Sequence, residues 1–354
     1  MQDKNNESPF ASAPLRLRLD GDALVSNWRA LDKHSGAARC GAAVKADGYG
    51  LGASQVVKLL SDAGCRDFFV AHWSEAVMLS KIVDPAFISV LNGAGPDDMP
   101  VALSLGARPV LNSAQQIRRW KIAGGGDCHV MIDSGINRLG IGPEQIDPTI
   151  FDGLQIDILA SHLASADEDS PQNQAQLQVF REASHKIDAK RLSFANSAGI
   201  MLGDDYHFDL TRPGLALYGG IARPEMDEFI RQVVYPQAQI LQLRTLSAGA
   251  SVGYNATYKC LADMQVATIA MGYADGYFRS FSGKGAARYN GQLLPVIGRV
   301  SMDLVTLDAS GVDNLAEGDW VDVDFSLTTA AALTGMSQYE LLTSLGRRSM
   351  RVWA

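Results

Sequence analysis

Apolar, β-branched runs alternate with segments of helical periodicity through the first half of the chain. Strands are predicted for residues 40–45, 68–73, 87–92, 108–112, 128–133, 157–162, 191–196 and 208–213. Helices are predicted between them for residues 53–63, 74–83, 113–123 and 171–188. In the first of these helices, Val56, Leu59, Leu60 and Ala63 repeat at helical spacing. A crossover between parallel strands needs a connection of helix length, so the alternation predicts parallel β-structure.

Two parallel architectures fit this alternation. Eight strand–helix units predict an α/β fold of the (β/α)8 TIM-barrel type. An open doubly wound sheet is the alternative, and it would bind a dinucleotide at its first strand–helix turn. That turn lies in "CGAAVKADGYGLGA", residues 40–53, which lacks the G-x-G-x-x-G spacing of such a site. The barrel is therefore the preferred prediction.

The pattern changes after residue 223. Short strands separated by glycine-rich turns are predicted at 235–246, 265–270, 293–297, 303–308 and 320–324. We therefore expect a barrel over residues 12–225 and a mainly-β C-terminal domain over residues 226–354. The early "LRLRLD" (15–20) alternates apolar and charged residues, so residues 12–22 could pair with the C-terminal domain. The final "RRSMRVWA" (347–354) shows no obvious further strand.

Composition excludes several classes of protein. With 354 residues and 47% hydrophobic content, the chain can bury a large core. A net charge of −8 without a basic stripe argues against a nucleic-acid partner. No apolar stretch approaches a membrane span, and "MQDKNNESPFASAP" at the N-terminus lacks the apolar core of a signal peptide. The 4 cysteines are scattered without a C-x-x-C pair, which predicts reduced thiols in a cytoplasmic protein and no metal site.

Polar side chains stand at the carboxyl ends of the predicted barrel strands, where barrel enzymes place their active sites. They are Lys45 and Tyr49 after the first strand, Asp133 and Arg138 after the fifth, His162 after the sixth, Asn196 and Ser197 after the seventh, and Arg212 and Gly214 after the eighth. Taken singly, each residue has an ordinary structural explanation, such as a solvated lysine or an ion-paired arginine. Their convergence on one rim favours a site.

Cationic and hydroxyl groups beside glycine-exposed amides suit an anion. Barrels often bind phosphate at the loops after strands seven and eight, here with the hydroxyl of Ser197 and the backbone N–H groups near Gly214 and Leu215. Lys45 faces these loops when the barrel closes. A phosphate beside a buried lysine suggests pyridoxal 5'-phosphate held as a Schiff base, because burial and neighbouring arginines would lower the lysine pKa.

A set of motifs in fixed order extends this interpretation through nearly the whole chain. They are "VKADGYG" (44–50), "DSGINRLG" (133–140), "SHLASAD" (161–167), "ANSAG" (195–199), "TRPGLALYG" (211–219), "VGYNATY" (252–258), "GYADGYFR" (272–279), "GRVSMD" (298–303) and "YELL" (339–342). With these motifs the chain resembles the alanine racemases, pyridoxal-phosphate enzymes of fold type III. The resemblance implies a homodimer that interconverts L- and D-alanine, for peptidoglycan or for L-alanine catabolism.

The resemblance also implies roles for individual residues. Lys45 would carry the cofactor as an aldimine and act as one acid/base, and Tyr254 of the second subunit would act as the other. Cofactor contacts would come from Lys45, Tyr49, His162, Asn196, Ser197, Arg212, Gly214, Leu215 and Tyr339. The substrate would meet Arg138 and Met302, and the entryway would be lined by Asp167, Tyr273, Arg279 and Arg299. No metal is implied.

One position departs from the family pattern. Many members carry a carbamylated lysine two residues before the aspartate of the "DSGINRLG" motif, where it steadies the arginine. Met131 stands there in this chain and cannot be carbamylated. Arg138 therefore lacks that anionic partner, and a bound anion or another side chain would have to replace it.

Other functions remain open at this point. The chain could racemise serine, lysine or a broad set of amino acids, since pocket size cannot be read from one sequence. A fold-type III decarboxylase needs no second base, which "VGYNATY" argues against. A non-catalytic pyridoxal-phosphate carrier would lack the C-terminal β domain.

Overall fold

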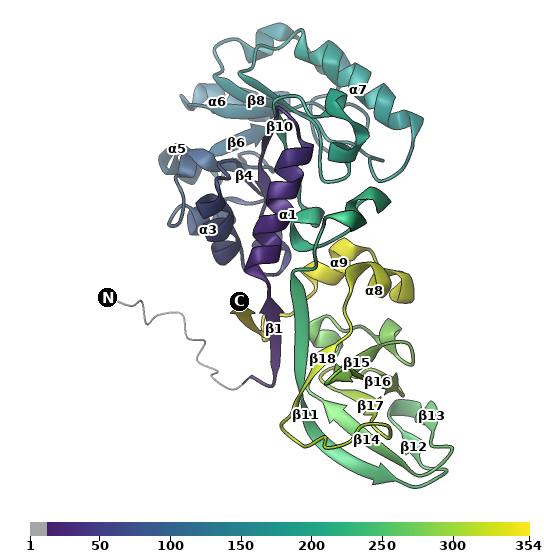
Figure 1. Cartoon of the computed structure of the whole chain (residues 1–354). Helices are drawn as coiled ribbons and strands as arrows, with labels where there is room; N and C mark the ends of the chain where they lie inside the picture. Colours follow the sequence, from purple (N-terminus) through teal and green to yellow (C-terminus); the bar gives the residue numbers. More distant parts are fainter. Residues whose placement is uncertain (1–12) are drawn as a thin grey trace. The chain divides into compact units, whose positions relative to one another are not determined.

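The computed structural model describes residues 13–354 (Figure 1). Residue 12, at which the predicted barrel begins, and most of the N-terminal stretch scanned for a signal peptide lie outside the described residues. The chain forms two compact units. One is Asp22–Arg231, and the other combines the segment that ends at Gly21 with Gln232–Ala354. Within residues 13–354, no helix has the length and apolarity needed to cross a bilayer.

The first unit is a parallel barrel. Its strands are β2 (Arg39–Cys40), β3 (Ala42–Ala43), β4 (Phe68–Val70), β5 (Ile88–Val90), β6 (Arg108–Leu111), β7 (Cys128–Met131), β8 (Ile156–Ala160), β9 (Arg191–Ser193) and β10 (Leu210–Thr211). They are hydrogen-bonded in the order β2-β10-β9-β8-β7-β6-β5-β4-β3. The barrel predicted from the sequence is confirmed, although most strands end a few residues earlier than expected.

Gly41 separates β2 from β3, and the two segments act as one strand of the barrel. The Gly41 N–H donates to the Thr211 carbonyl at 2.9 Å on one side, and the Ala42 N–H donates to the Asp67 carbonyl at 2.8 Å on the other. A side chain at Gly41 would press against that Asp67 carbonyl. The β2–β3 segment, the first barrel strand in the sequence, therefore closes the barrel between β4 and β10.

Helices cover the outside of these strands (Figure 1). They are α1 (Gly21–His34), α3 (Ala53–Ala63), α4 (Trp73–Leu79), α5 (Met99–Leu105), α6 (Ala114–Ile122) and α7 (Pro171–Ser184). Helix α3 has the predicted bounds, whereas α1 and α5 were missed. Short 3-10 turns replace helices after β7, β9 and β10, such as η4 (Gly199–Leu202) and η6 (Leu215–Tyr218). The repeat is therefore a TIM-type barrel with incomplete helical crossovers.

Charged side chains form a network at the amino ends of the strands, opposite the rim that carries the candidate site. Asp157 accepts hydrogen bonds from Arg108 at 2.7 Å and from Arg191 at 2.8 Å. Arg191 also donates to Asp67 at 2.9 Å. Burial raises the pKa of Asp157, but the Arg191 hydrogen bond and charge outweigh burial, so the pKa lies below its ordinary value. The network joins strand ends that are distant in sequence.

The second unit is an antiparallel β-structure. Its long strand β11 (Val234–Leu246) pairs with both β18 and β14, which closes the ring β14-β17-β16-β15-β18-β11. The other members are β14 (Met264–Ile269), β15 (Ala286–Tyr289), β16 (Gln292–Ile297), β17 (Val305–Asp308) and β18 (Trp320–Val323). Helices α8 (Leu327–Thr334) and α9 (Gln338–Thr343) follow. A mainly-β C-terminal domain was predicted, and this part of the fold is confirmed.

Both ends of the described chain enter this sheet. Strand β1 (Leu15–Leu19) runs antiparallel to β11, with Leu17 opposite Pro236. Strand β19 (Met350–Trp353) runs parallel to β1 on its other side. The expectation that the C-terminus carries no further strand was wrong. Arginines hide the strand pattern in this segment, and its backbone partner, β1, lies at the opposite end of the sequence.

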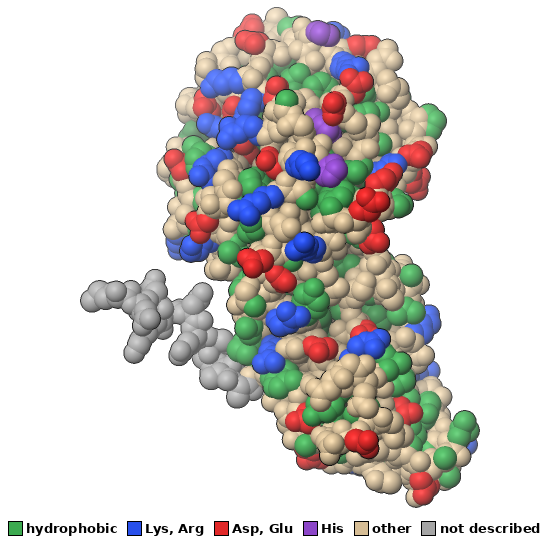
Figure 2. All heavy atoms as spheres, viewed as in Figure 1, with side chains coloured by type: hydrophobic (Ala, Val, Ile, Leu, Met, Phe, Trp, Pro, Cys, Tyr) green, Lys and Arg blue, Asp and Glu red, His purple; other side chains and the backbone are tan. Residues whose placement is uncertain are grey.

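Charged side chains of both signs are interspersed over the visible face of the molecule in Figure 2. No basic stripe stands out on that face. Long-range attraction of a polyanion would require charges of one sign to be gathered. The face seen there therefore shows no patch that would suit a polyanion.

Candidate active site

Lys45 follows β3 and begins a left-handed turn, labelled α2 (Lys45–Tyr49). The φ angles are 55° for Ala46, 56° for Asp47, 63° for Gly48 and 53° for Tyr49. Non-glycine residues seldom adopt this conformation, and a run of them persists only when the surroundings enforce it. The sequence predicted a glycine-rich turn here but not its left-handed form. The turn places Lys45 and Tyr49 on the rim of the barrel unit.

Lys45 lies within electrostatic reach of the other cationic residues that the sequence placed on this rim. Burial and the positive charge of Arg138 lower the pKa of the Lys45 amine from its ordinary value. Burial and the charges of Arg212, Arg138 and Lys45 lower the pKa of His162 to about 3. The structure therefore brings these residues together from four strand ends. It keeps His162 uncharged at neutral pH and makes the Lys45 amine easier to deprotonate than an ordinary lysine.

Arg212 is buried, and neutral groups hold its guanidinium. Its Nη2 donates to the Ser161 carbonyl at 2.6 Å, and its Nη1 donates to the Ser193 hydroxyl. No ion pair between residues 13–354 includes Arg212. Burial lowers its pKa to about 10, which leaves it protonated at neutral pH. Its charge is thus available to a group that enters the rim.

Ser197 and the backbone from Gly214 to Ala216 form a small hydrogen-bonded cradle. The Ser197 hydroxyl accepts the backbone N–H of Gly214 at 2.9 Å and that of Ala216 at 3.3 Å. Leu215, predicted as a cofactor contact, begins the turn η6 between them. A side chain at Gly214 would occupy the position of the Tyr49 hydroxyl. The absence of a β-carbon therefore lets the tyrosine reach this cradle.

The Arg138 loop is shaped by one carboxylate. Asp133 accepts the N–H groups of Gly135 at 2.9 Å, Asn137 at 3.0 Å and Arg138 at 3.0 Å. The Arg138 side chain is exposed, and the ion pairs of residues 13–354 do not include it. Met131 is buried at the end of β7 and offers no charge. No anionic partner replaces the family's lysine among the described side chains.

Two other predicted barrel residues have different surroundings. The Asn196 side-chain oxygen accepts the Gly199 N–H at 2.9 Å, so that oxygen is already used to begin the turn η4. Asp167 is exposed in the loop after β8. Arg223 fastens this loop, because its Nη1 donates to the Ala166 carbonyl at 2.9 Å. No motif in the sequence pointed to Arg223.

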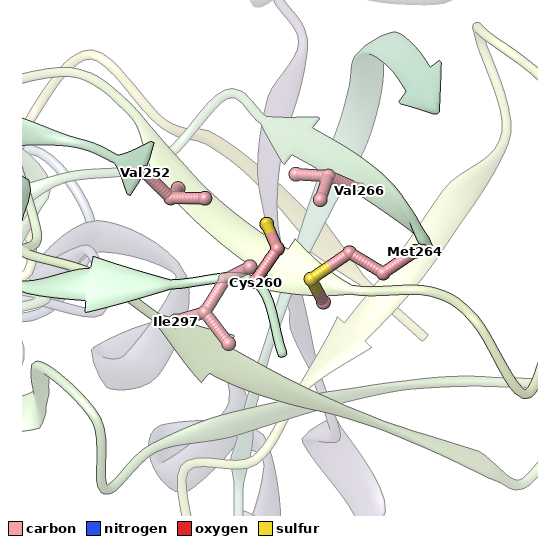
Figure 3. Close-up of a cluster of buried hydrophobic side chains, with 5 residues drawn as sticks. All are labelled: Val252, Cys260, Met264, Val266 and Ile297. Atoms are coloured by element: carbon pink, nitrogen blue, oxygen red, sulfur yellow. The ribbon is translucent and has the colours of Figure 1, made fainter. Parts of the chain in front are cut away.

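Tyr254 belongs to the C-terminal unit, in a turn between β12 (Ser251–Val252) and β13 (Tyr258–Lys259). Its side chain is 64% exposed. Val252, the last residue of β12, and Cys260, which follows β13, belong to a buried cluster with Met264, Val266 and Ile297 (Figure 3). The cluster anchors both short strands to the sheet. An exposed tyrosine is thus carried on a firmly packed hairpin.

The turns that carry Tyr273 and Met302 are joined by backbone hydrogen bonds. The Tyr273 N–H donates to the Ser301 carbonyl at 3.0 Å, and the Ala274 N–H donates to the Met302 carbonyl at 3.1 Å. A side chain at Gly272 would collide with the Met302 carbonyl. The Met302 side chain is 53% exposed. The two predicted residues are therefore neighbours in the C-terminal unit.

Three further predicted residues lie in the same unit. The Arg279 guanidinium is 5.4 Å from the centre of the Tyr273 ring. Gly253, which precedes Tyr254, approaches the backbone of Arg299. Tyr339 lies apart from these turns in sequence, on α9, with its side chain half-exposed.

Arg348, which no motif in the sequence pointed to, fastens the Tyr273 and Met302 turns. Its Nε donates to Asp275 at 2.5 Å, and its Nη2 donates to Asp303 at 2.7 Å. Asp275 is buried and accepts the Gly272 N–H at 2.9 Å. The clamp thus links the C-terminal segment to both turns.

The barrel residues fit a phosphate-bearing aldehyde. The Lys45 amine has a lowered pKa, as attack on a carbonyl requires. The Ser197 hydroxyl accepts the Gly214 N–H, so its own hydrogen can be donated to a phosphate, and the missing β-carbon of Gly214 lets the Tyr49 hydroxyl approach. Among residues 13–354, no cluster of three or more potential metal ligands is present.

Comparison with known proteins gives full-length matches. The alanine racemase N-terminal domain matches residues 19–222, and the alanine racemase C-terminal domain matches residues 233–353. A catabolic alanine racemase of Agrobacterium fabrum is 42% identical over 95% of this chain and 91% of its own. A biosynthetic alanine racemase of the same organism is 39% identical over 98% of this chain and 95% of its own.

A solved structure matches equally far. It is the alanine racemase of Bartonella henselae, with covalently bound pyridoxal phosphate. It has a TM-score of 0.90 and 35% identity, and the match covers 96% of this chain and 99% of that chain. Both the barrel and the C-terminal β-structure are included in the likeness.

Proposed function

Because the chain belongs to the alanine racemase family, we propose that it interconverts L-alanine and D-alanine with pyridoxal 5'-phosphate held at Lys45. The observation that carries the proposal is the Lys45 amine, whose pKa is lowered by burial and by Arg138 on a rim shared with His162 and Arg212. When bound, the cofactor supplies an electron sink that acidifies the α-hydrogen of an amino acid. Either hand of alanine could then lose that proton.

Specific side chains and backbone groups of the chain would hold the cofactor. The Ser197 hydroxyl would bind the phosphate together with Tyr49, Tyr339 and the backbone at Gly214 and Leu215. Arg212 is protonated, and its guanidinium donates only to neutral groups, so it would present a fixed positive charge to the ring. Arg138, exposed and outside the described ion pairs, would receive the substrate carboxylate.

Racemisation needs one proton-transfer group on each face of the α-carbon. Lys45 would act on one face as a free amine. Tyr254 from a second copy of the chain would act on the other, which its 64% exposure and its anchored hairpin support. His162, neutral at working pH, would not add a positive charge beside the reacting groups. The homodimer and the cytoplasmic location expected from the sequence remain predictions.

The test combines cofactor binding with product analysis. We expect purified protein with pyridoxal phosphate to absorb at about 420 nm, and borohydride to leave a stable pyridoxyl group on the Lys45 peptide. Chiral chromatography should then detect D-alanine formed from L-alanine, with serine and lysine tested in parallel. Equal rates with all three amino acids would identify a broad-specificity racemase instead.

Replacement of the lysine is the decisive variant. We expect Lys45→Ala to lower racemisation by about a thousandfold or more, because it removes both the cofactor bond and one proton carrier. Lys58→Ala is the matched control, since Lys58 is an exposed lysine paired with Asp62 at 2.7 Å. Full activity in Lys45→Ala without an added amine would contradict the mechanism.

A further inference from the structure

We propose that Glu75 is a positioning residue that holds the left-handed turn after Lys45 and balances the charge of the lysine. The inference deepens the proposed function and rests on it only for the role of Lys45. Glu75 is the third residue of helix α4 (Trp73–Leu79), which follows the neighbouring strand β4. The family motifs identified in the sequence do not include it.

The Glu75 carboxylate bridges the ends of two barrel strands. Its Oε1 accepts the backbone N–H of Ala46 at 2.6 Å. Its Oε2 accepts the N–H of Ala71 at 2.8 Å and that of His72 at 3.1 Å. One side chain thus accepts the backbone N–H of the residue that follows Lys45 and the N–H groups of the two residues that follow β4. Hydrogen bonds to a carboxylate are shorter and stronger than those between neutral groups.

The left-handed turn depends on such an external acceptor. From Ala46 to Tyr49 every residue has a positive φ, and only Gly48 is a glycine. The bonds inside the turn join later residues, such as the Gly50 N–H to the Ala46 carbonyl at 2.9 Å. The Ala46 N–H points to Glu75 instead. Since Ala46 is bonded directly to Lys45, this contact fixes where the lysine side chain leaves the backbone.

Glu75 also acts on Lys45 through its charge. Burial and Arg138 lower the pKa of Lys45, and the Glu75 carboxylate opposes them. The other nearby carboxylate, Asp47, accepts the Ala53 N–H at 2.9 Å and thereby begins helix α3. His162 and Arg212 face the same rim from β8 and β10 without adding negative charge. Glu75 is therefore the anion that limits how far the lysine pKa falls.

The two effects can be separated by substitution. In Glu75→Gln the carboxamide oxygen would turn toward the two donors of Ala71 and His72, and its NH₂ group would face the Ala46 N–H. Both the Ala46 hydrogen bond and the negative charge are lost. In Glu75→Asp the charge remains, but the shorter side chain cannot span both strand ends. Asp84→Asn is the matched control, because Asp84 accepts one backbone N–H, from Ala86 at 2.9 Å, at the opposite end of β5.

Two measurements on the cofactor-free protein test the proposal. Hydrogen exchange of the 45–50 segment reports the turn, and the pH profile of Lys45 labelling by a trace acylating reagent reports the amine pKa. We expect Glu75→Gln to raise Ala46 exchange at least about tenfold and to lower the Lys45 pKa below that of the wild type, because the one opposing charge is removed. Glu75→Asp should raise exchange while it keeps the Lys45 pKa nearer the wild-type value. Asp84→Asn should change neither.

The outcomes distinguish this inference from the proposed function. Unchanged Ala46 exchange and an unchanged Lys45 pKa in a folded Glu75→Gln protein would overturn the positioning role, whatever the activity of the enzyme. If Glu75→Gln unfolds the barrel as a whole, exchange protection will also be lost in β6 to β8. Glu75→Asp then serves as the test, because the proposal requires it to raise exchange in the 45–50 segment while β6 to β8 stay protected. A wild-type protein that racemises no amino acid would instead refute the proposed function.

Discussion

At the scale of single residues, the candidate site is an arrangement of positive charge with few carboxylates. Arg212 is held by a carbonyl and a hydroxyl, and His162 is kept neutral by burial and by the cations around it. The Glu75 carboxylate, which raises the Lys45 pKa, accepts the backbone N–H of the next residue, Ala46. Such a rim suits a ligand that brings its own negative charge, as a phosphate ester and an amino-acid carboxylate do.

Several of these residues could be predicted because strand ends in a barrel face the same rim. Lys45, Arg138, His162 and Arg212 follow four buried strands, so their convergence follows from topology alone. Glu75 and Arg348 could not be predicted in this way. Their partners are backbone N–H groups or aspartates brought close by tertiary structure, and no spacing in the sequence announces such contacts.

At the scale of elements, the helical spacing of apolar residues predicted the bounds of α3 correctly, whereas the first barrel strand differs from its prediction. The predicted strand 40–45 is divided at Gly41, and its last residue begins the left-handed turn. The cause is tertiary, since the close approach of Asp67 and the contact with Glu75 decide both features. Local preference carries no information about either neighbour.

The ion-pair network at the amino ends of the strands leads to a prediction about the barrel. We expect Arg191→Met to lower the free energy of unfolding by about 3 kcal/mol at neutral pH, because Asp157 and Asp67 lose a partly buried partner. Denaturant unfolding measures this. Arg181→Met is the control, since the Arg181–Asp205 pair is exposed and should contribute about 0.5 kcal/mol or less.

The same network should make stability depend on pH. The pKa of Asp157 is lower in the folded chain than its ordinary value, so its contribution is present above that ordinary value and is lost as the pH falls through the folded value. The difference between wild type and Arg191→Met should therefore shrink on acidification. A difference that stays constant down to strongly acidic pH would show that the ion pairs do not carry the effect.

At the scale of the whole molecule, the polypeptide forms two units from three segments. The chain leaves the β unit after β1, builds the barrel, and returns at residue 232. This interrupted order was foreshadowed by the alternation in "LRLRLD", whose leucines are buried and whose arginines are partly exposed. The strand beside it in the sheet, β19, was hidden by the arginines in and before it, Arg347, Arg348 and Arg351. A strand such as β19, whose partner lies at the other end of the chain, can thus form without an alternating apolar pattern of its own.

This arrangement predicts a localised effect of a core substitution. Leu17 is fully buried in β1, so Leu17→Ala should cost about 3 kcal/mol of unfolding free energy. Hydrogen exchange should show lost protection in β11 and β19, which pair with β1, while β6 to β8 stay protected. Leu103→Ala, at a residue that is 46% exposed, is the control. Equal loss of protection in both units would mean that they unfold as one.

The pairing of β1 also has a consequence for synthesis on the ribosome. Both partners of this strand are encoded downstream, one beginning at residue 234 and the other at residue 350, so β1 emerges first and completes its pairing last. The barrel segment can meanwhile fold as it is translated. In the finished protein, Arg16 and Arg18 stack on Trp320 and Tyr235, at 4.0 and 4.2 Å from the ring centres. Before those rings exist, the same two charges lie on a free edge strand, where positive charge opposes aggregation of nascent chains.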